Sequence, residues 1–180
     1  MEPKEELIWF VMRDLKRANA KNPAYKVLGE MGLEVFTPMK ERLTVKRGRR
    51  VREDVPFIQD LLFVHSTKEI VDGIVELIPT LQYRYLKGAY MQPMIVGTEE
   101  MERFIFALSY SEQPKYFMPG EITADMCGKQ ICIVGGPLNG YSGRLLKVRG
   151  SKTKRLIVEL PQLFSIGVEV EPEYIQFVEE

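Results

Sequence analysis

The sequence predicts an α+β protein: an N-terminal antiparallel sheet flanked by helices, followed by a small C-terminal β-barrel. In the first 110 residues, apolar strand patterns alternate with helical patterns. After residue 125 the helical patterns stop, and short strand patterns follow one another at close spacing. A polar, proline-containing stretch near 111–115 separates the halves. We therefore expect domains at 1–110 and 125–180, joined by a linker at 111–124.

Each element of the first half has a local signal. Apolar runs or alternation predict strands, and these fall at 7–13, 34–38, 61–65 and 83–85, with a hairpin across 40–54. Apolar residues at helical spacing predict helices, and these cover 23–31, 66–78 and 98–108. Asn22 is the expected N-cap of the first helix and Thr98 that of the third. A capping box at 66–69 is expected to start the second, and Gly48 to form the hairpin tip.

The second half is predicted from strands and turns alone. Its strands are expected at 129–134, 143–148, 155–160, 167–170 and 174–178. The glycine-rich stretch at 135–143 resembles a phosphate-binding loop only superficially. Such a loop needs Gly-Lys-Ser or Gly-Lys-Thr opening a helix, whereas Gly143 is followed by Arg144 and a strand pattern. We therefore interpret the stretch as strand, turn and strand.

Composition indicates a cytoplasmic protein that does not enter membranes. No apolar run approaches the roughly 18–20 residues that span a bilayer, and the N-terminus does not have the pattern of a signal peptide. Two cysteines, Cys127 and Cys132, fit a reducing compartment. The 25 basic and 25 acidic residues balance, so net charge indicates no partner. We expect a monomer.

Catalysis has little support in the sequence. His65 is the single histidine and lies at a strand end, which favours a structural role. Together with Cys127 and Cys132 it matches neither the spacing of a zinc site nor a local nucleophile–base pair. We expect no enzyme activity, no metal and no cofactor.

Basic residues gather in three places. The hairpin carries Arg47, Arg49 and Arg50 near its tip, where they could contact a nucleic-acid backbone or form a solvated turn; the sequence leaves both open. A second group follows the first strand and includes Arg13, Lys16 and Arg17. A third group lies at 149–155, where a structural role is favoured. The stretch 169–180 carries five glutamates and argues against nucleic acid along that edge.

The stretch 128–146 combines alternating apolar residues, a Gly136-Pro137 turn and Gly143 before the next strand. This pattern resembles the KOW motif of a small SH3-like barrel. Together with the first strand, Trp9-Phe10-Val11, it makes nearly the whole chain similar to the NusG-type transcription elongation and antitermination factors, which join an NGN domain to a KOW domain. The housekeeping phenylalanine-proline-glycine-tyrosine pattern is absent at 57–64. In this respect the chain is more similar to specialised paralogues of the RfaH and UpxY types.

The resemblance implies partners for the first domain. The NGN domain would bind the clamp helices of the largest RNA polymerase subunit through an apolar patch, whose matching residues are Phe10, Leu61, Phe63 and Tyr85. Trp9 is expected in the core. Arg13, Lys16 and Arg17 would face upstream or non-template DNA. Binding of this kind would suppress pausing or termination.

For the KOW domain, the resemblance implies a partner such as a small-subunit ribosomal protein or a termination factor. The matching loop carries Leu163 and Phe164. An exposed Phe164 would be an interaction site and a buried one would be core, and the sequence leaves this open. The alternative function is a ribosome-associated or RNA-binding KOW module, although the neutral charge is unlike that of ribosomal proteins.

Overall fold

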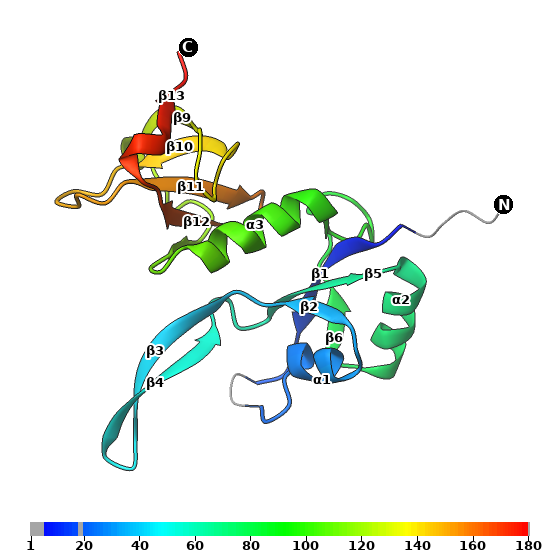
Figure 1. Cartoon of the computed structure of the whole chain (residues 1–180). Helices are drawn as coiled ribbons and strands as arrows, with labels where there is room; N and C mark the ends of the chain where they lie inside the picture. The colour runs from blue at the N-terminus through cyan, green and yellow to red at the C-terminus, as the bar shows by residue number, and fades with distance from the viewer. Residues whose placement is uncertain (1–5, 18–19, 180) are drawn as a thin grey trace. The chain divides into compact units, whose positions relative to one another are not determined.

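Residues 6–17 and 20–179 are described by the computed structural model, and the chain divides into two units, Met1–Thr98 and Glu99–Glu180 (Figure 1). The division places most of helix α3 (Thr98–Tyr110) with the C-terminal strands. The sequence pattern instead placed it at the end of the first domain. The physical reason is packing: the ring of Phe104 on α3 meets that of Phe164 edge-on, with centroids 5.3 Å apart.

The N-terminal unit contains an antiparallel sheet with the order β2-β5-β1-β6, and β7 pairs with β1. Its strands are β1 (Ile8–Asp14), β2 (Glu34–Phe36), β5 (Leu61–Ser66), β6 (Leu81–Tyr83) and β7 (Ile95–Val96). Helices α1 (Ala24–Glu30) and α2 (Lys68–Leu77) connect them. The predicted order of strands and helices is therefore present.

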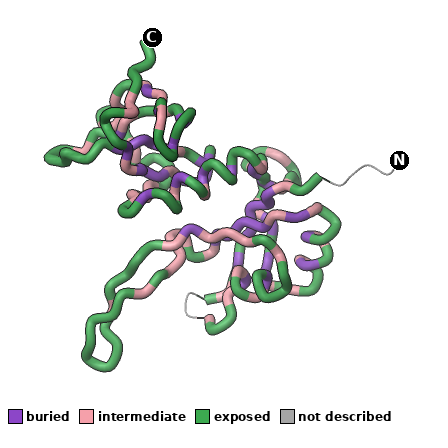
Figure 2. Tube along the Cα trace, viewed as in Figure 1, coloured by how far each residue is buried: buried purple, intermediate pink, exposed green. Residues whose placement is uncertain are grey.

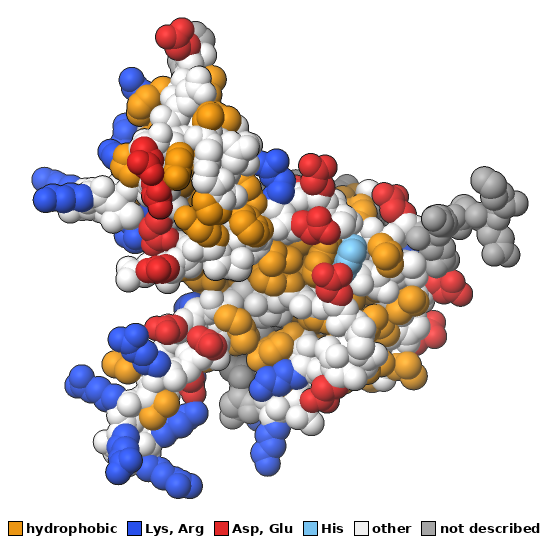
Figure 3. Space-filling model, in the orientation of Figure 1, with side chains coloured by type: hydrophobic (Ala, Val, Ile, Leu, Met, Phe, Trp, Pro, Cys, Tyr) orange, Lys and Arg blue, Asp and Glu red, His pale blue; other side chains and the backbone are white. Residues whose placement is uncertain are grey.

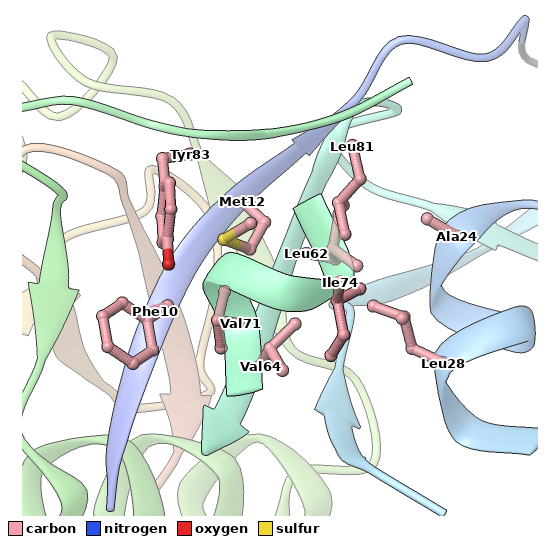
Figure 4. Packing of buried hydrophobic residues seen from close by; sticks show 10 residues of the cluster. All are labelled: Phe10, Met12, Ala24, Leu28, Leu62, Val64, Val71, Ile74, Leu81 and Tyr83. Carbon is pink, nitrogen blue, oxygen red and sulfur yellow. The ribbon is translucent and has the colours of Figure 1, made fainter. Parts of the chain in front are cut away.

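Both helices pack on one face of this sheet (Figure 4). The buried cluster joins side chains of β1, β5 and β6 to the apolar sides of α1 and α2: Phe10, Met12, Ala24, Leu28, Leu62, Val64, Val71, Ile74, Leu81 and Tyr83. Register explains the selection, because Phe10 pairs with Val64 and Met12 with Leu62, and directly paired residues share a face.

The helix starts differ from the predicted ones. Pro23, not Asn22, is the N-cap of α1, and no side chain of the cap residue bonds to the helix. The buried carboxylate of Asp14 supplies the acceptor instead, since its Oδ2 accepts from the Ala24 amide at 2.6 Å. For α2 the cap is Thr67, one residue after the expected position, because Ser66 still belongs to β5.

Helix α3 also begins one residue early. Thr98 is its first helical residue, and its hydroxyl donates to the Leu7 carbonyl at 3.2 Å. The expected capping role of Thr98 is therefore wrong.

A separate two-stranded hairpin extends from the N-terminal unit, and nearly all of it is exposed (Figure 2). It consists of β3 (Met39–Lys46) and β4 (Arg49–Pro56), paired without interruption along their length. The turn has positive φ at Arg47 (51°) and Gly48 (75°), as a type I′ turn requires. The predicted hairpin with Gly48 at its tip is confirmed.

The C-terminal unit is an antiparallel sheet in the order β13-β9-β10-β11-β12-β8, with α3 and two 3-10 turns. Its strands are β8 (Lys115–Phe117), β9 (Cys127–Ile133), β10 (Ser142–Leu146), β11 (Arg155–Leu160), β12 (Phe164–Glu169) and β13 (Ile175–Phe177), and the turns are η1 (Ala124–Met126) and η2 (Pro172–Tyr174). The predicted α+β class with an all-β C-terminal part is confirmed. Strand β8, which pairs with β12, lies within the stretch predicted as linker.

Candidate functional site

The second face of the N-terminal sheet carries a different apolar set. Strand pairing puts Trp9 opposite His65, Val11 opposite Phe63, and Arg13 opposite Leu61, all on the face away from α1 and α2. Trp9 stacks on His65 with ring centroids 4.8 Å apart. Neither helix of the N-terminal unit covers this face, and for that reason we call it the open-sheet face, although Trp9, Val11, Leu61 and Phe63 on it are buried.

The residues predicted to bind polymerase do not form one surface. Phe10 lies on the helix-covered face, where it meets Tyr83 edge-on with ring centroids 5.8 Å apart. Leu61 and Phe63 lie on the open-sheet face, yet they are only 1% and 0% exposed. Tyr85 is 44% exposed and its ring is 6.2 Å from that of Tyr83. The predicted patch is therefore wrong as a single exposed surface, because successive strand residues point to opposite faces.

His65 is held in place by its neighbours. Its Nδ1 lies 2.6 Å from the Glu34 carboxylate, and its Nε2 lies 3.3 Å from the Thr98 hydroxyl. With Trp9 stacked on the ring, these contacts support the structural role expected for this residue.

The basic residues at the end of β1 and just after it are largely engaged inside the N-terminal unit. Arg13 Nε donates to the Asp60 carboxylate at 3.0 Å. Lys16 Nζ donates to the Asn22 carbonyl at 2.7 Å. Arg17 is exposed. Two of the three residues predicted to face DNA therefore have partners. Asp60 compensates the charge of Arg13, and the Asn22 carbonyl holds Lys16 in position.

The basic side chains of the hairpin form two groups, those that pair with a carboxylate and those that do not. Glu53 accepts from Arg42 at 2.6 Å and from Lys46 at 2.7 Å, and its hydrogen bonds, from Lys46 first and then Arg42, lower the pKa of its carboxyl. Arg52 pairs with Glu41 at 3.4 Å. Within the described residues, Arg47, Arg49 and Arg50 have no ion pair. The basic side chains gathered at this tip are visible in Figure 3.

Sequence patterns did not indicate the loop after β6. Leu86 donates its amide to the Gln92 carbonyl at 2.9 Å, and Tyr85 bridges Pro93, so the chain folds back on itself. Tyr90 at its tip is 95% exposed, and Met91 has a φ of 45°. The only available signal was the turn-forming Gly88, which does not indicate an exposed aromatic side chain.

In the C-terminal sheet, Gly143 is required by a close approach. A Cβ at this position would lie 2.8 Å from the Ile157 carbonyl oxygen and 3.0 Å from Leu156 Cδ1. This close approach of β10 and β11 accounts for glycine at position 143, which lies within β10 rather than before it.

Leu163 and Phe164 are buried, Phe164 to 2% exposure. The sequence left open whether Phe164 is an exposed interaction site or part of the core, and in this structure it is part of the core. They follow Gln162, whose φ is 65°, and Leu163 donates its amide to the Leu160 carbonyl at 3.0 Å. Packing of Phe104 against Phe164 means that a partner could reach this ring only if α3 moved.

Within the described residues, no three His, Cys, Asp or Glu side chains come together as a metal site would require. Cys127 and Cys132 are free and half-buried. None of the described helices has the length and apolar character needed to cross a bilayer.

Comparison with known proteins concerns mainly the N-terminal unit and α3. Residues 7–105 match the family model described as transcription termination factor nusG. The chain belongs to the NusG family. NusG-family proteins are transcription elongation and termination factors without enzyme activity, and members interact with RNA polymerase. The chain is accordingly a transcription factor of this general kind.

Among solved structures, one described as "Domain interaction in Thermotoga maritima NusG" is similar to this NusG-family chain, with 13% identity and a TM-score of 0.49. The alignment covers 97% of this chain and 98% of the Thermotoga chain. A comparison with curated proteins finds no match.

Proposed function

We propose that this NusG-family protein binds RNA polymerase through its N-terminal unit and favours elongation over pausing or termination. The family match over residues 7–105 carries the proposal, because that range includes the whole N-terminal sheet and its helices. Such a factor must bind the elongating polymerase more tightly than the paused one. A coupling of about 1–3 kcal/mol corresponds to a change of roughly 5- to 150-fold.

The open-sheet face is the proposed docking surface for the clamp helices of the largest polymerase subunit. It is apolar, as a surface that receives a partner helix needs to be. Leu61 and Phe63 are buried in the free chain, so they can contact polymerase only in a state that exposes them. The apparent affinity for polymerase is then reduced in proportion to the fraction of molecules in that state. Tyr85, already exposed, lies beside Tyr83 of the helix-covered face and is a separate proposed contact that requires no opening.

Binding to a reconstituted elongation complex tests this surface. We expect Tyr85→Ala to weaken binding, while Tyr90→Ala, a more exposed tyrosine of the same loop, serves as the matched control. In addition, amides of β1 and β5 should gain protection from hydrogen exchange in the complex. Equal effects of the two substitutions would reject the Tyr85 contact, and the absence of added protection in β1 and β5 would reject the open-sheet face. Aspartate at Leu61 or Phe63 is avoided, because a buried charge would unfold the unit.

The hairpin tip is the proposed contact with upstream or non-template DNA. Its support is charge, since Arg47, Arg49 and Arg50 are the cations of the tip without an ion pair among the described residues. Arg50 and Arg52 allow a matched test, because both lie on β4 with cross-strand partners Val45 and Leu43 on the same face, and only Arg52 is paired. We expect Arg50→Gln to lower the salt dependence of duplex binding by about 0.9 in log–log slope. Arg52→Gln should change it less.

For the C-terminal unit we propose an adaptor role towards a ribosomal protein or a termination factor. The burial of Leu163 and Phe164 requires α3 to move before this loop can bind. We also propose a specialised role on particular operons, supported by the departure from the housekeeping pattern at 57–64. Mapping the factor's occupancy across the genome tests this, and uniform occupancy on all transcribed genes would reject it.

A further inference from the structure

A groove of about 760 Å³ lies in the C-terminal unit, at one end of the sheet. Its apolar lining includes Met126, Leu145, Leu146, Val148 and Phe177. These side chains come from η1, β10 and the segment after it, and β13, so strands distant in sequence build one concave surface.

Cations surround this apolar lining. The groove is lined by Lys129, Lys147, Arg149 and Lys154, against one acidic side chain, Asp125. All four cations are exposed, and none has an ion pair within the part of the chain that the structure describes. Figure 3 shows basic side chains over the turn between β10 and β11, at the left of the view.

Backbone contacts hold the cationic segments in position. The Lys147 amide donates to the Met126 carbonyl at 2.7 Å, which ties the end of β10 to η1. The Ser151 amide donates to the Val148 carbonyl at 3.1 Å, and Gly150 has a φ of 79°, so Arg149 lies in a tight turn over 148–151 and Lys154 follows this turn. The Lys154 carbonyl accepts from Val170 at 3.0 Å.

An aromatic ring is available beside these charges. Phe177 is 56% exposed at the end of β13, and Lys129 Nζ lies 5.5 Å from its ring centroid. An exposed ring next to uncompensated cations suits a ligand that has both a π-face and phosphate charge. Single-stranded nucleic acid is such a ligand, because its bases stack on aromatic side chains while its backbone follows a positive groove.

A second groove in the same unit shows why charge compensation matters. It has a volume of about 540 Å³ and also contains basic residues, but Glu112, Glu169 and Glu171 line it as well. There Arg155 is buried and pairs with Glu169 at 3.5 Å. The buried arginine of this groove is therefore neutralised within the protein. Lys152 and Lys154 line it as well, but together with three glutamates, whereas the groove beside Phe177 has Asp125 as its one acidic residue among those described.

We propose that the groove bounded by Lys129, Lys147, Arg149, Lys154 and Phe177 binds single-stranded nucleic acid, with a base stacked on Phe177 and phosphates along the cations. This site is separate from the hairpin tip and from the polymerase surface proposed above. It would provide the C-terminal unit with a direct contact to an exposed strand at a transcribing polymerase.

Fluorescence anisotropy of the full chain with labelled 12-nucleotide RNA and DNA strands of one sequence tests the proposal. We expect Phe177→Ala to weaken binding about ten-fold. The double variant Lys147→Gln with Arg149→Gln should reduce the salt slope by about 1.4, from two lost contacts of about 0.7 each. Arg144→Gln, an exposed arginine of β10 outside the groove lining, is the matched control and should bind as wild type.

The hairpin tip is the other proposed nucleic-acid contact, so each groove variant is also measured in a background with Arg47→Asn, Arg49→Gln and Arg50→Gln. Equal fold-losses in both backgrounds support an independent groove site. Tighter binding of RNA would identify the transcript as the strand, and equal or tighter binding of DNA would support the same site with a DNA strand. Three results overturn the proposal: wild-type binding by folded groove variants, an equal loss in Arg144→Gln, or equal affinity for a glutamate-rich peptide.

Discussion

Tyr141 and Arg103 bond to each other where helix α3 meets the C-terminal sheet. The Tyr141 hydroxyl donates to the Arg103 carbonyl at 2.7 Å, and the Arg103 guanidinium lies 4.5 Å from the centroid of the Tyr141 ring. Arg103 also donates to the Gly140 carbonyl at 3.2 Å. Burial raises the pKa of Tyr141, while the charge of Arg103 opposes that rise. Helix α3 is therefore attached by polar contacts in addition to the packing of Phe104 on Phe164.

Removal of this hydrogen bond should loosen α3. We expect Tyr141→Phe to cost about 0.5–1.5 kcal/mol, because it deletes one donor and keeps the ring. Hydrogen exchange of the α3 amides measures the effect, which should exceed that on β9 amides. Tyr110→Phe, at the exposed end of α3, is the control. An unchanged exchange rate in α3 would show that Tyr141 does not hold the helix.

Movement of α3 should expose the KOW loop. We expect Phe104→Ala to uncover Phe164 and to increase binding of an apolar dye such as ANS, provided that the sheet stays folded. Phe106→Ala removes an exposed ring of the same helix and should leave dye binding unchanged. Far-UV circular dichroism checks that both variants retain their secondary structure. Similar dye binding by the two variants would show that Phe104 does not mask the loop.

The pair Tyr83–Asp72 should make the stability of the N-terminal unit depend on alkaline pH. Burial, and then the 2.7 Å hydrogen bond to Asp72, raises the pKa of Tyr83 above its ordinary value of 10.0. The neutral phenol favours the folded state, so this contribution is fully present below pH 10 and is lost as the pH rises through the folded-state pKa.

Comparison with Tyr83→Phe isolates this effect, because phenylalanine keeps the ring but cannot ionise. Below pH 10 the variant should be less stable by about 0.5–1.5 kcal/mol, and above pH 10 the gap should narrow. Urea unfolding followed by the fluorescence of Trp9, the single tryptophan of the chain, reports on this unit. A constant gap from pH 8 to 11 would contradict the prediction.

Two glycine-to-alanine changes should act in opposite directions. Gly143→Ala places a methyl group 2.8 Å from the Ile157 carbonyl and should cost on the order of 1–3 kcal/mol. Gly73→Ala lies inside α2 with nothing within 4 Å of the new methyl and should stabilise by about 0.5–1 kcal/mol. Calorimetric melting compares them. A neutral Gly143→Ala would mean that β10 and β11 separate at little cost.

Asp14 rather than Asn22 should control the start of α1. Asp14→Ala leaves the Ala24 amide without its acceptor and should cost about 0.5–2 kcal/mol, as loss of a helix cap does. Asn22→Ala, which removes the residue expected from sequence to cap the helix, should change stability by much less. Trp9 fluorescence during urea unfolding measures both, and a larger loss for Asn22→Ala would restore the sequence-based assignment.

Local patterns by themselves determined most of the elements. Apolar alternation located the strands, the glycine at the hairpin tip marked its turn, and Gly143 marked the KOW-like motif. These features depend on backbone geometry and on the spacing of apolar residues, which act over a few residues and are visible in a single sequence. The α+β class and the family resemblance follow from their order.

Tertiary structure alone decided how the functional candidates are distributed. Strand register put Phe10 and Phe63 on opposite faces, although both read as apolar strand residues. Packing against α3 turned Phe164 from a potential contact into core. Ion pairing divided the hairpin cations, and the groove beside Phe177 combines residues from 125 to 177. Burial and charge compensation depend on contacts between residues far apart in the chain. Local patterns in a single sequence do not reveal these contacts.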